Sequence, residues 1–345
     1  MSEQTISPAN ILVLGAGNFG TCLANHLSHE GKNVTIWARD KTVVESINKE
    51  HKNPKYLSTI NLSPTLKAIN TIDASIMKTV EALVVAVPMQ AMRSVLNSLA
   101  PLFNSEKILI CSVKGIEIST GSLPLQLYAE IFGSNISKQA VVLSGPSFAI
   151  EVAQQLPTAV VAASHSPARA KSVQNLFHAP HFRVYTSDDP IGLEVAAALK
   201  NVIAIASGAC AGLGLQMNSM AAIITRGLAE MTHLGVKMGA NPLTFQGLGG
   251  VGDLFLTCSS SKSRNYSLGF QLGQGRTVAE ALETLGSVSE GYTTAKAAEE
   301  LSKRYQVENP IIHQVHNVLY NKRPIKDALM QLITRDAKAE FKFSK

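Results

Sequence analysis

Short apolar runs recur along the first half of the chain at intervals suited to the strands of one sheet. They are Ile11–Leu14, Val34–Trp37, Leu83–Val87, Ile108–Cys111, Val141–Leu143 and Ala159–Ala162. The runs are continuously hydrophobic, and segments long enough for helices separate them, as in a parallel sheet with both faces covered. This pattern predicts an α/β domain with a doubly wound parallel sheet over residues 1–188.

The pattern changes after Asp189, where strand-like runs give way to segments rich in Ala, Leu and Glu, separated by loops rich in Gly and Ser. Pro190 suits the first position of a helix. We predict helices at 190–208, 218–234, 277–285, 292–304, 310–320 and 324–335. Residues 189–345 are therefore expected to form an all-helical C-terminal domain.

The most apolar long window, Val195–Gly214, carries Lys200 and Asn201 near its middle. A charge at the centre of a bilayer is costly, so this window predicts a buried helix and no stable membrane insertion. Residues 1–10 are polar and lack the cationic start and apolar run of a secretory signal, which indicates a cytoplasmic protein.

Composition excludes two further classes of protein. Hydrophobic residues make up 46% of the 345 residues and charged residues 16%, which excludes a disordered chain. The net charge is +6, but the sequence has no dense basic stripe of the kind found in a nucleic-acid binder, so no nucleic-acid partner is expected.

The four cysteines lie far apart with no CxxC pair, which predicts reduced core residues.

Three His-x-x-His pairs occur, at His26/His29, His178/His181 and His313/His316. On a helix this spacing places two imidazoles on one face. None of the pairs has a Cys or carboxylate in a recognised metal pattern, so we interpret them as surface histidines and expect no metal.

The first strand leads directly into GAGNFG at Gly15–Gly20, and an amphipathic helix follows before the second strand. Strand, glycines and helix within about 30 residues are what a dinucleotide-binding βαβ unit requires. Gly15 permits the tight turn, Gly17 lets a pyrophosphate approach the backbone, and Gly20 lets helix and strand pack closely. The sheet is therefore expected to be of the Rossmann type.

The end of the second strand decides which nicotinamide cofactor is preferred, because an acidic residue there accepts from the ribose 2′-hydroxyl of NAD. The sequence has Arg39 followed by Asp40. A guanidinium can pair with a 2′-phosphate, so NADP is favoured over NAD. The alternative for Arg39 is a surface pairing with Asp40.

Lys200 is unusual among the predicted helices, because its neighbours three and four residues away are Ala196, Ala197, Ile203 and Ala204. On such a small apolar face, desolvation lowers the pKa of an ammonium towards that of a useful proton donor. A lysine that snorkels to solvent is the alternative.

Several motifs together resemble bacterial NAD(P)-dependent glycerol-3-phosphate dehydrogenase over about residues 10–335. They are Gly15–Gly20, Val87-Pro88, Ser112–Gly115, Ser144–Ser147, Leu199–Asn201, Gly249–Asp253 and Ser263–Asn265. The resemblance implies reversible reduction of dihydroxyacetone phosphate to sn-glycerol 3-phosphate, a precursor of phospholipids, by a cytoplasmic homodimer. It also implies that the helical domain binds substrate and carries the dimer interface.

The resemblance also implies residue roles. Lys200 is expected to accept the proton in alcohol oxidation and to donate it in ketone reduction, with Lys114 and Asp253 beside it. Substrate contacts are expected from Lys114, Gly145, Ser147, Lys200, Asp253, Thr257, Ser263, Arg264 and Asn265, with Arg264 and Asn265 on the phosphate. Cofactor contacts are expected from Gly15, Gly17, Asn18, Phe19, Gly20, Arg39, Lys114, Ala149, Arg264, Val288 and Glu290.

Asn18-Phe19 departs from the family pattern, which more often has a small residue followed by Trp or Tyr. The alternative function is a two-domain NADP-dependent dehydrogenase of the hydroxyacid or 6-phosphogluconate type, for which Arg264 would bind a carboxylate. A non-catalytic NADP-binding sensor is disfavoured, since it has no need for Lys114 and Lys200.

Overall fold

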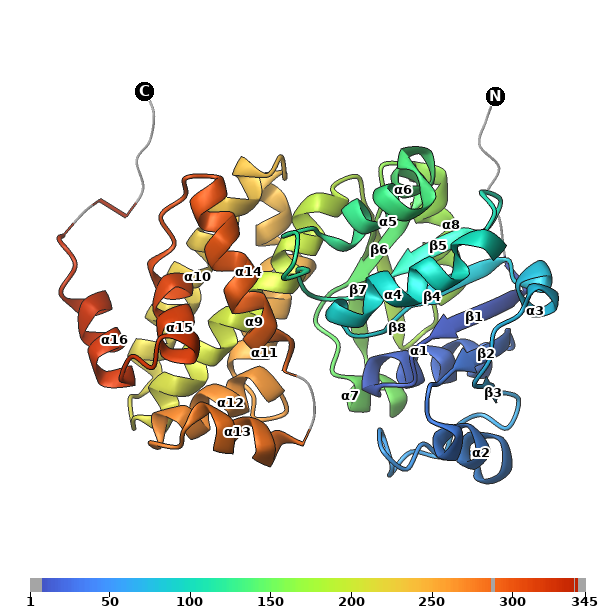
Figure 1. Cartoon of the computed structure of the whole chain (residues 1–345), viewed down its shortest axis with the longest axis horizontal. Coiled ribbons are helices and arrows are strands. Elements are labelled where there is room, and N and C mark those ends of the chain that lie inside the picture. The colour runs from blue at the N-terminus through green and yellow to red at the C-terminus, as the bar shows by residue number, and fades with distance from the viewer. Residues whose placement is uncertain (1–7, 287–288, 338, 341–345) are drawn as a thin grey trace.

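The computed structural model describes residues 8–286, 289–337 and 339–340. In this part of the chain, an α/β lobe and a helical lobe lie side by side (Figure 1). The strands of the α/β lobe are β1 (Asn10–Leu14), β2 (Asn33–Trp37), β3 (Lys67–Ile69), β4 (Ala82–Val85), β5 (Ile108–Cys111), β6 (Val141–Ser144), β7 (Thr158–Ala163) and β8 (Phe182–Ser187). The predicted fold class, a Rossmann-type sheet followed by a helical domain, is confirmed.

The sheet has the strand order β3-β2-β1-β4-β5-β6-β7-β8. The order reverses between β1 and β4, and ligands of such folds bind where it does so, at the carboxyl ends of the strands. One part of the prediction is wrong, because β7 pairs antiparallel with β6, and β8 is parallel to β7. The single helix between β6 and β7, Ala149–Ala153, spans about 7 Å, which is too short to carry the chain back along the sheet.

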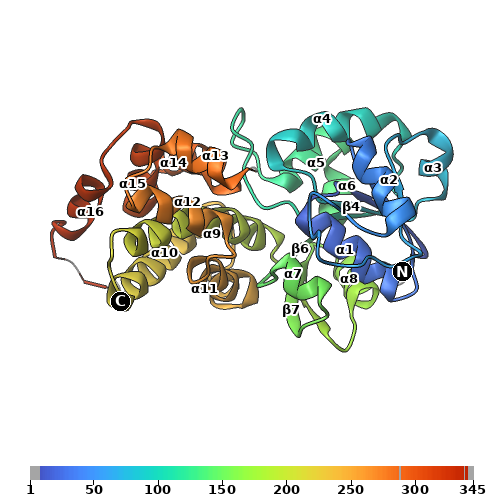
Figure 2. The same cartoon turned by 90° about the horizontal axis from the view of Figure 1, so that it is seen from below.

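Helices cover both faces of the sheet (Figure 2). They are α1 (Asn18–His29), α2 (Lys41–Glu50), α3 (Ala74–Thr79), α4 (Met89–Leu99), α5 (Pro124–Phe132), α6 (Ser134–Gln139), α7 (Ala149–Ala153) and α8 (Pro167–Phe177), with a 3₁₀ turn η1 at Ala100–Leu102. In β1, Ile11 and Val13 join the core under α1 and α8, whereas Leu12 and Leu14 join the core under α4 and α5. Burial on both sides explains why the strands are continuously hydrophobic.

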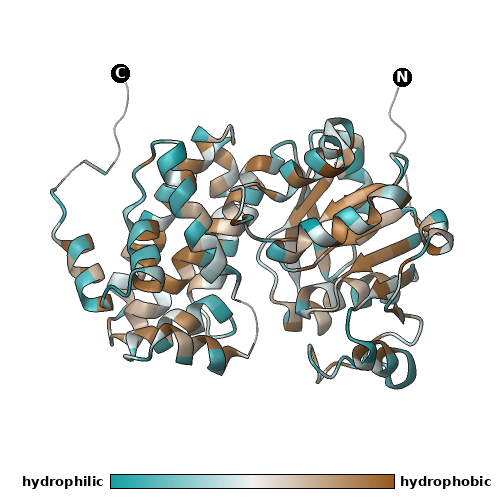
Figure 3. Cartoon of the chain, viewed as in Figure 1, coloured by the Kyte–Doolittle hydropathy of each residue, from teal (hydrophilic) through white to brown (hydrophobic). Residues whose placement is uncertain are grey.

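The helical lobe is built around α9, which lies in its middle (Figures 1 and 3). Its elements are α9 (Pro190–Gly212), α10 (Met217–Lys237), η2 (Pro242–Gln246), η3 (Leu248–Gly252), α11 (Asp253–Cys258), α12 (Arg264–Gly273), α13 (Val278–Leu285), α14 (Glu290–Arg304), α15 (Pro310–Tyr320) and α16 (Ile325–Ile333). By length and composition α9 could span a membrane, but 78% of its apolar window is buried inside the protein. It is therefore a core helix, as the sequence predicts.

Candidate active site

The loop between β1 and α1 has the backbone of a phosphate-binding turn. Gly15 has a φ of +108°, which favours glycine, and a Cβ on Gly20 would lie 1.9 Å from the carbonyl oxygen of Gly15. A Cβ on Gly17 would meet nothing within 4 Å. Gly17 caps α1 without a side-chain hydrogen bond, so the first N–H groups of the helix remain open to a ligand. These features fit a dinucleotide pyrophosphate.

Arg39 and Asp40 follow β2 and differ in their surroundings. Asp40 caps α2 by accepting from the backbone N–H of Thr42, and it forms an ion pair with Lys55. The hydrogen bond from Lys55 holds the pKa of Asp40 well below its usual range. Arg39 is exposed, and its guanidinium has no hydrogen bond or ion pair with any described residue. The alternative pairing of Arg39 with Asp40 is therefore not seen.

Three charged side chains meet at the junction of the lobes. Asp253, which is 1% exposed, accepts a hydrogen bond at 2.5 Å from the ammonium of Lys200 and another at 3.0 Å from that of Lys114. Lys114 follows β5 in the α/β lobe, whereas Lys200 and Asp253 belong to the helical lobe. Lys200 also donates to the hydroxyl of Thr257 at 2.9 Å, and that hydroxyl donates to the backbone carbonyl of Asp253 at 2.6 Å.

Burial and neighbouring charges set the protonation of this cluster. Burial lowers the pKa of Lys200 to about 8, assisted by the positive charge of Lys114 and opposed by Asp253. For Asp253, burial acts to raise the pKa, but the two ammonium groups outweigh it and hold the pKa below its usual range. The cluster therefore holds a permanent carboxylate beside an ammonium that can release its proton near neutral pH.

The cluster also touches the nucleotide loop. The ammonium of Lys114 lies 5.4 Å from the centroid of the Phe19 ring and 3.4 Å from the carbonyl oxygen of Gly145. Gly145 has a φ of +150°, and the hydroxyl of Ser147 donates to the same carbonyl at 3.0 Å. Among the residues expected to contact substrate and cofactor, Phe19 at the start of α1, Gly145 and Ser147 thus lie close to Lys114.

Close packing of α9 on α12 places the remaining polar residues. A Cβ on Gly208 would lie 2.0 Å from the carbonyl oxygen of Tyr266, and one on Gly269 would lie 1.9 Å from that of Ile205. Gly212 and Gly273, one turn further along each helix, are equally crowded. The absence of side chains lets the two backbones touch, which brings the start of α12 to the middle of α9.

Asn265, at the start of α12, forms a buried network. Its amide nitrogen donates to Asn201 Oδ1 at 2.9 Å, and its oxygen accepts from the hydroxyl of Ser289 at 2.7 Å and from the backbone N–H of Gly291 at 2.9 Å. The Asn265 side chain is thus hydrogen-bonded to other residues of the protein. Asn201 adjoins Lys200, but the sequence alone assigned it no role.

Arg264 is exposed beside this network, and Ser263 caps α12. Glu290 accepts from the backbone N–H of Met89 at 3.3 Å, and burial raises its pKa, opposed by Met89 and by the charge of Arg264. Its second oxygen is buried and has no partner in the described part of the chain. Ala149 begins α7. Val288 lies outside the described residues.

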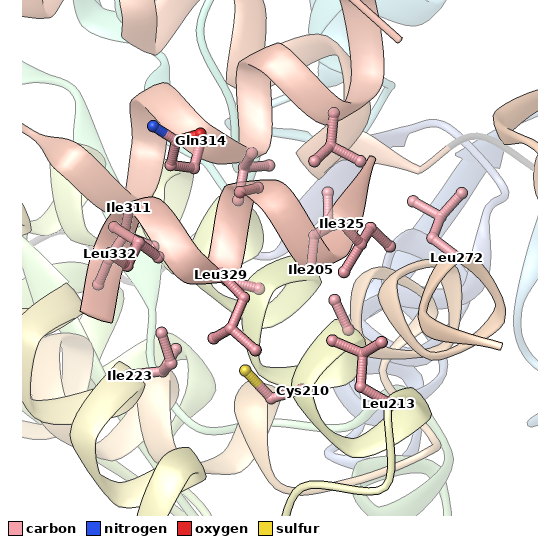
Figure 4. A pocket seen from close by; sticks show the side chains of 15 residues that line it. Ile205, Cys210, Leu213, Ile223, Leu272, Ile311, Gln314, Ile325, Leu329 and Leu332 are labelled. Atoms are coloured by element: carbon pink, nitrogen blue, oxygen red, sulfur yellow. The ribbon is translucent and has the colours of Figure 1, made fainter. Parts of the chain in front are cut away.

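A separate pocket lies in the helical lobe among α9, α10, α12, α15 and α16 (Figure 4). Its lining includes Ile205, Leu213, Ile223, Leu329 and Leu332 and is almost entirely apolar. Cys210 in this pocket, like the other three cysteines, is buried and unpaired, as predicted. Because the pocket offers no charged group for a phosphate, it is not the candidate active site.

Comparison with known proteins gives a consistent family. The models of the N-terminus and the C-terminus of NAD-dependent glycerol-3-phosphate dehydrogenase match residues 10–170 and 189–330. An NAD(P)+-dependent glycerol-3-phosphate dehydrogenase of Geobacter sulfurreducens is 47% identical over 328 residues, which cover 95% of this chain and 98% of that protein.

Solved structures agree with this family. The crystal structure of a glycerol-3-phosphate dehydrogenase from Coxiella burnetii has a TM-score of 0.89 at 35% identity and covers 94% of this chain and 99% of that one. A D-mandelate dehydrogenase solved with NADH has a TM-score of 0.60 at 13% identity, covering 93% and 99% of the two chains, and so shares the fold alone.

Proposed function

Because this chain belongs to the NAD-dependent glycerol-3-phosphate dehydrogenase family and is an NAD(P)-dependent oxidoreductase of that type, we propose that Lys200, Lys114 and Asp253 carry its chemistry. The reaction is the reversible reduction of dihydroxyacetone phosphate to sn-glycerol 3-phosphate. The observation that carries the proposal is the contact of both ammonium groups with one buried carboxylate. We also propose that residues 1–188 bind the dinucleotide and residues 189–345 bind the substrate and form the dimer interface.

The nicotinamide cofactor, when bound, supplies the hydride that reaches the ketone carbon. Lys200 donates a proton to the ketone oxygen, for which a pKa of about 8 is well matched. Lys114 stabilises the negative charge that develops on that oxygen. Asp253 and Thr257 hold the Lys200 ammonium in place, and Asp253 offsets part of the positive charge of the two lysines.

The other residues expected from the sequence would contact the cofactor or the substrate. Gly15, Gly17, Asn18, Phe19 and Gly20 would hold the cofactor, with Ala149, Val288 and Glu290 lining its site. Arg264 would bind the substrate phosphate, joined by the α12 start at Ser263 and Asn265, with Gly145 and Ser147 as further contacts. Because the Asn265 side chain is bonded to Asn201, Ser289 and Gly291, its contribution would come from its backbone N–H.

For the cofactor we propose a preference for NADP. Arg39 is exposed at the end of β2, whereas Asp40, the alternative acceptor for a ribose hydroxyl, is bonded to Lys55 and Thr42. Arg39→Ala should narrow the ratio of kcat/KM for NADPH over NADH, because the 2′-phosphate loses its guanidinium. An unchanged ratio would assign that phosphate to another residue.

By resemblance we further propose a cytoplasmic homodimer that supplies sn-glycerol 3-phosphate for glycerophospholipid synthesis. No metal is assigned to the reaction. Light scattering of the purified protein tests the dimer, since a mass near twice 36.8 kDa is expected.

The substrate is tested by the loss of nicotinamide absorbance in the presence of NADPH. We expect oxidation of NADPH with dihydroxyacetone phosphate and far less with unphosphorylated dihydroxyacetone, because the latter lacks the phosphate that Arg264 would bind. Three-carbon 2-keto acids provide the comparison for the hydroxyacid alternative. A faster reaction with a 2-keto acid than with dihydroxyacetone phosphate would contradict the proposed function.

A further inference from the structure

A cluster of three metal-ligating side chains lies at the far end of α1 from the glycine loop. One ligand atom from each of His26, Glu30 and His181 lies within 4.8 Å of the other two. His26 and Glu30 are four residues apart and share a face at the end of α1, and His181 comes from the turn between α8 and β8. Two of the His-x-x-His pairs in the sequence each contribute one histidine to this cluster. The prediction that His26 is a surface histidine is wrong, since the residue is buried and only 4% exposed.

The hydrogen bonding of His26 leaves one lone pair available. Its Nε2 lies 2.8 Å from the backbone carbonyl oxygen of Phe177, and a carbonyl only accepts, so Nε2 carries the hydrogen. Nδ1 is then the unprotonated nitrogen, and it is buried with no hydrogen-bond partner among the described residues. An imidazole that donates one N–H to a backbone carbonyl and keeps the other nitrogen free is the arrangement of metal-bound histidines.

The charge state of His26 suits a metal ligand as well. Burial lowers its pKa, and this effect outweighs the hydrogen bond to the carbonyl of Phe177 and the charge of Glu30, which act to raise it. The ring is therefore neutral at physiological pH, as metal coordination requires. A buried nitrogen without a partner is costly to the fold, and a bound cation would remove that cost.

We propose that His26, Glu30 and His181 bind one Zn²⁺ ion, with water in a fourth position. Two imidazole nitrogens and one carboxylate oxygen are ligands that Zn²⁺ accepts at about 2.0–2.2 Å, which places ligand atoms about 3.4 Å apart. Glu30 is exposed and His181 is half-buried, so both side chains have room to close in on the buried His26. The two histidine rings already stand nearly perpendicular, with centroids 5.4 Å apart.

The position of the site indicates its role. The 12 residues of α1 span about 18 Å, so the ion would bind far from the glycine loop. It would join the end of α1 to the turn before β8 and stabilise the α/β lobe without contacting substrate or cofactor. This site is independent of the proposed catalytic roles.

The test is calorimetric titration of the full-length protein, freed of metal by a chelator, with Zn²⁺ alone. We expect one equivalent to bind, and Glu30→Gln and His181→Ala each to weaken binding by at least about tenfold. Both side chains are accessible, so these variants should fold even where a change at buried His26 would not. Zn²⁺ should raise the Tm of the wild type and not that of His181→Ala.

His178→Ala is the matched control, because His178 is exposed in the same turn but lies outside the cluster. Its affinity for Zn²⁺ should equal that of the wild type. Co²⁺ provides a second readout, since its visible absorption should appear in the wild type and in His178→Ala and be lost in His181→Ala. Three results would each overturn the proposal. They are no Zn²⁺ binding by the wild type, an affinity of Glu30→Gln and His181→Ala equal to that of the wild type, and loss of Zn²⁺ binding in His178→Ala.

Discussion

Lys200 combines a buried position with hydrogen bonds to Asp253 and Thr257, and this combination makes the reaction depend on pH. Ketone reduction needs the protonated ammonium, so kcat/KM for reduction should fall as pH rises through about 8. Alcohol oxidation needs the neutral amine, so kcat/KM in that direction should fall as pH decreases through about 8. Initial rates in both directions across this range provide the measurement, and a reductive kcat/KM that does not respond to pH would contradict the role of Lys200.

Arg264 is the exposed cation beside the buried Asn265 network, and a phosphate is its expected partner. Arg264→Ala should raise the KM for dihydroxyacetone phosphate through the loss of about 1.5–3 kcal/mol, which is roughly 10- to 150-fold. The exposed Lys237→Ala is a suitable control and should leave KM unchanged. A normal KM in the Arg264 variant would place the phosphate elsewhere.

Residues differ in how far the sequence alone reveals them. Lys200 is recognisable because a charge stands on a small apolar face of a predicted helix. Lys114 and Asp253 are 139 residues apart, so only the family resemblance, and then the fold, brings them together. The Asn201–Asn265 bond could not be predicted, since a pair of amides has no distinctive spacing.

At the scale of elements, glycines at the junction of β1 and α1 have two different roles. Gly17 leaves space for a ligand, whereas Gly20 allows close packing of the backbone. Gly17 has space where a Cβ would point, and its φ of −74° suits any residue, so Gly17→Ala should leave the Tm of the cofactor-free protein unchanged. The added methyl group should meet the pyrophosphate and weaken cofactor binding by about 1–3 kcal/mol. Fluorescence titration with NADPH measures this effect.

Gly20→Ala provides the contrast with Gly17→Ala. Its new Cβ would clash with the carbonyl oxygen of Gly15, so this variant should have a lower Tm than the wild type. Unchanged NADPH affinity in Gly17→Ala would place the pyrophosphate away from this loop.

The contact of α9 with α12 depends on glycines in both helices. Gly208→Ala should destabilise the protein by about 1–3 kcal/mol, because its Cβ would overlap the carbonyl oxygen of Tyr266. Activity should fall as well, since α12 would move its start away from Lys200. In Gly252→Ala the nearest atom to the new Cβ is 3.7 Å away, so its Tm should stay close to that of the wild type. Equal Tm values for the two variants would contradict this account of the packing.

Four elements that the sequence did not predict, β3, β8, α11 and α12, were missed for different physical reasons. β8 alternates, with Phe182 and Val184 buried and Arg183 exposed, and so lacks a continuous apolar run. β3 has three residues. α12 contains Gly269 and Gly273, which are poor helix formers, and only its packing against α9 makes them favourable. α11 has only six residues.

Across the whole molecule, the two lobes each supply part of one charged cluster. Lys114 lies in the α/β lobe, whereas Lys200 and Asp253 lie in the helical lobe. The doubly wound sheet and the change to helices near Asp189 follow from the hydrophobic pattern, because burial on both faces imposes continuous apolar strands. The antiparallel β7 does not, since an apolar run has no direction.

The central claim is that Lys200 is the proton donor to the ketone, and turnover of Lys200→Ala with NADPH and dihydroxyacetone phosphate tests it most directly. We predict that kcat falls by about 10²–10⁴-fold, the usual effect of losing acid–base catalysis, while NADPH affinity stays close to that of the wild type. Near-normal turnover in Lys200→Ala, with the wild type active beside it, would contradict the claim.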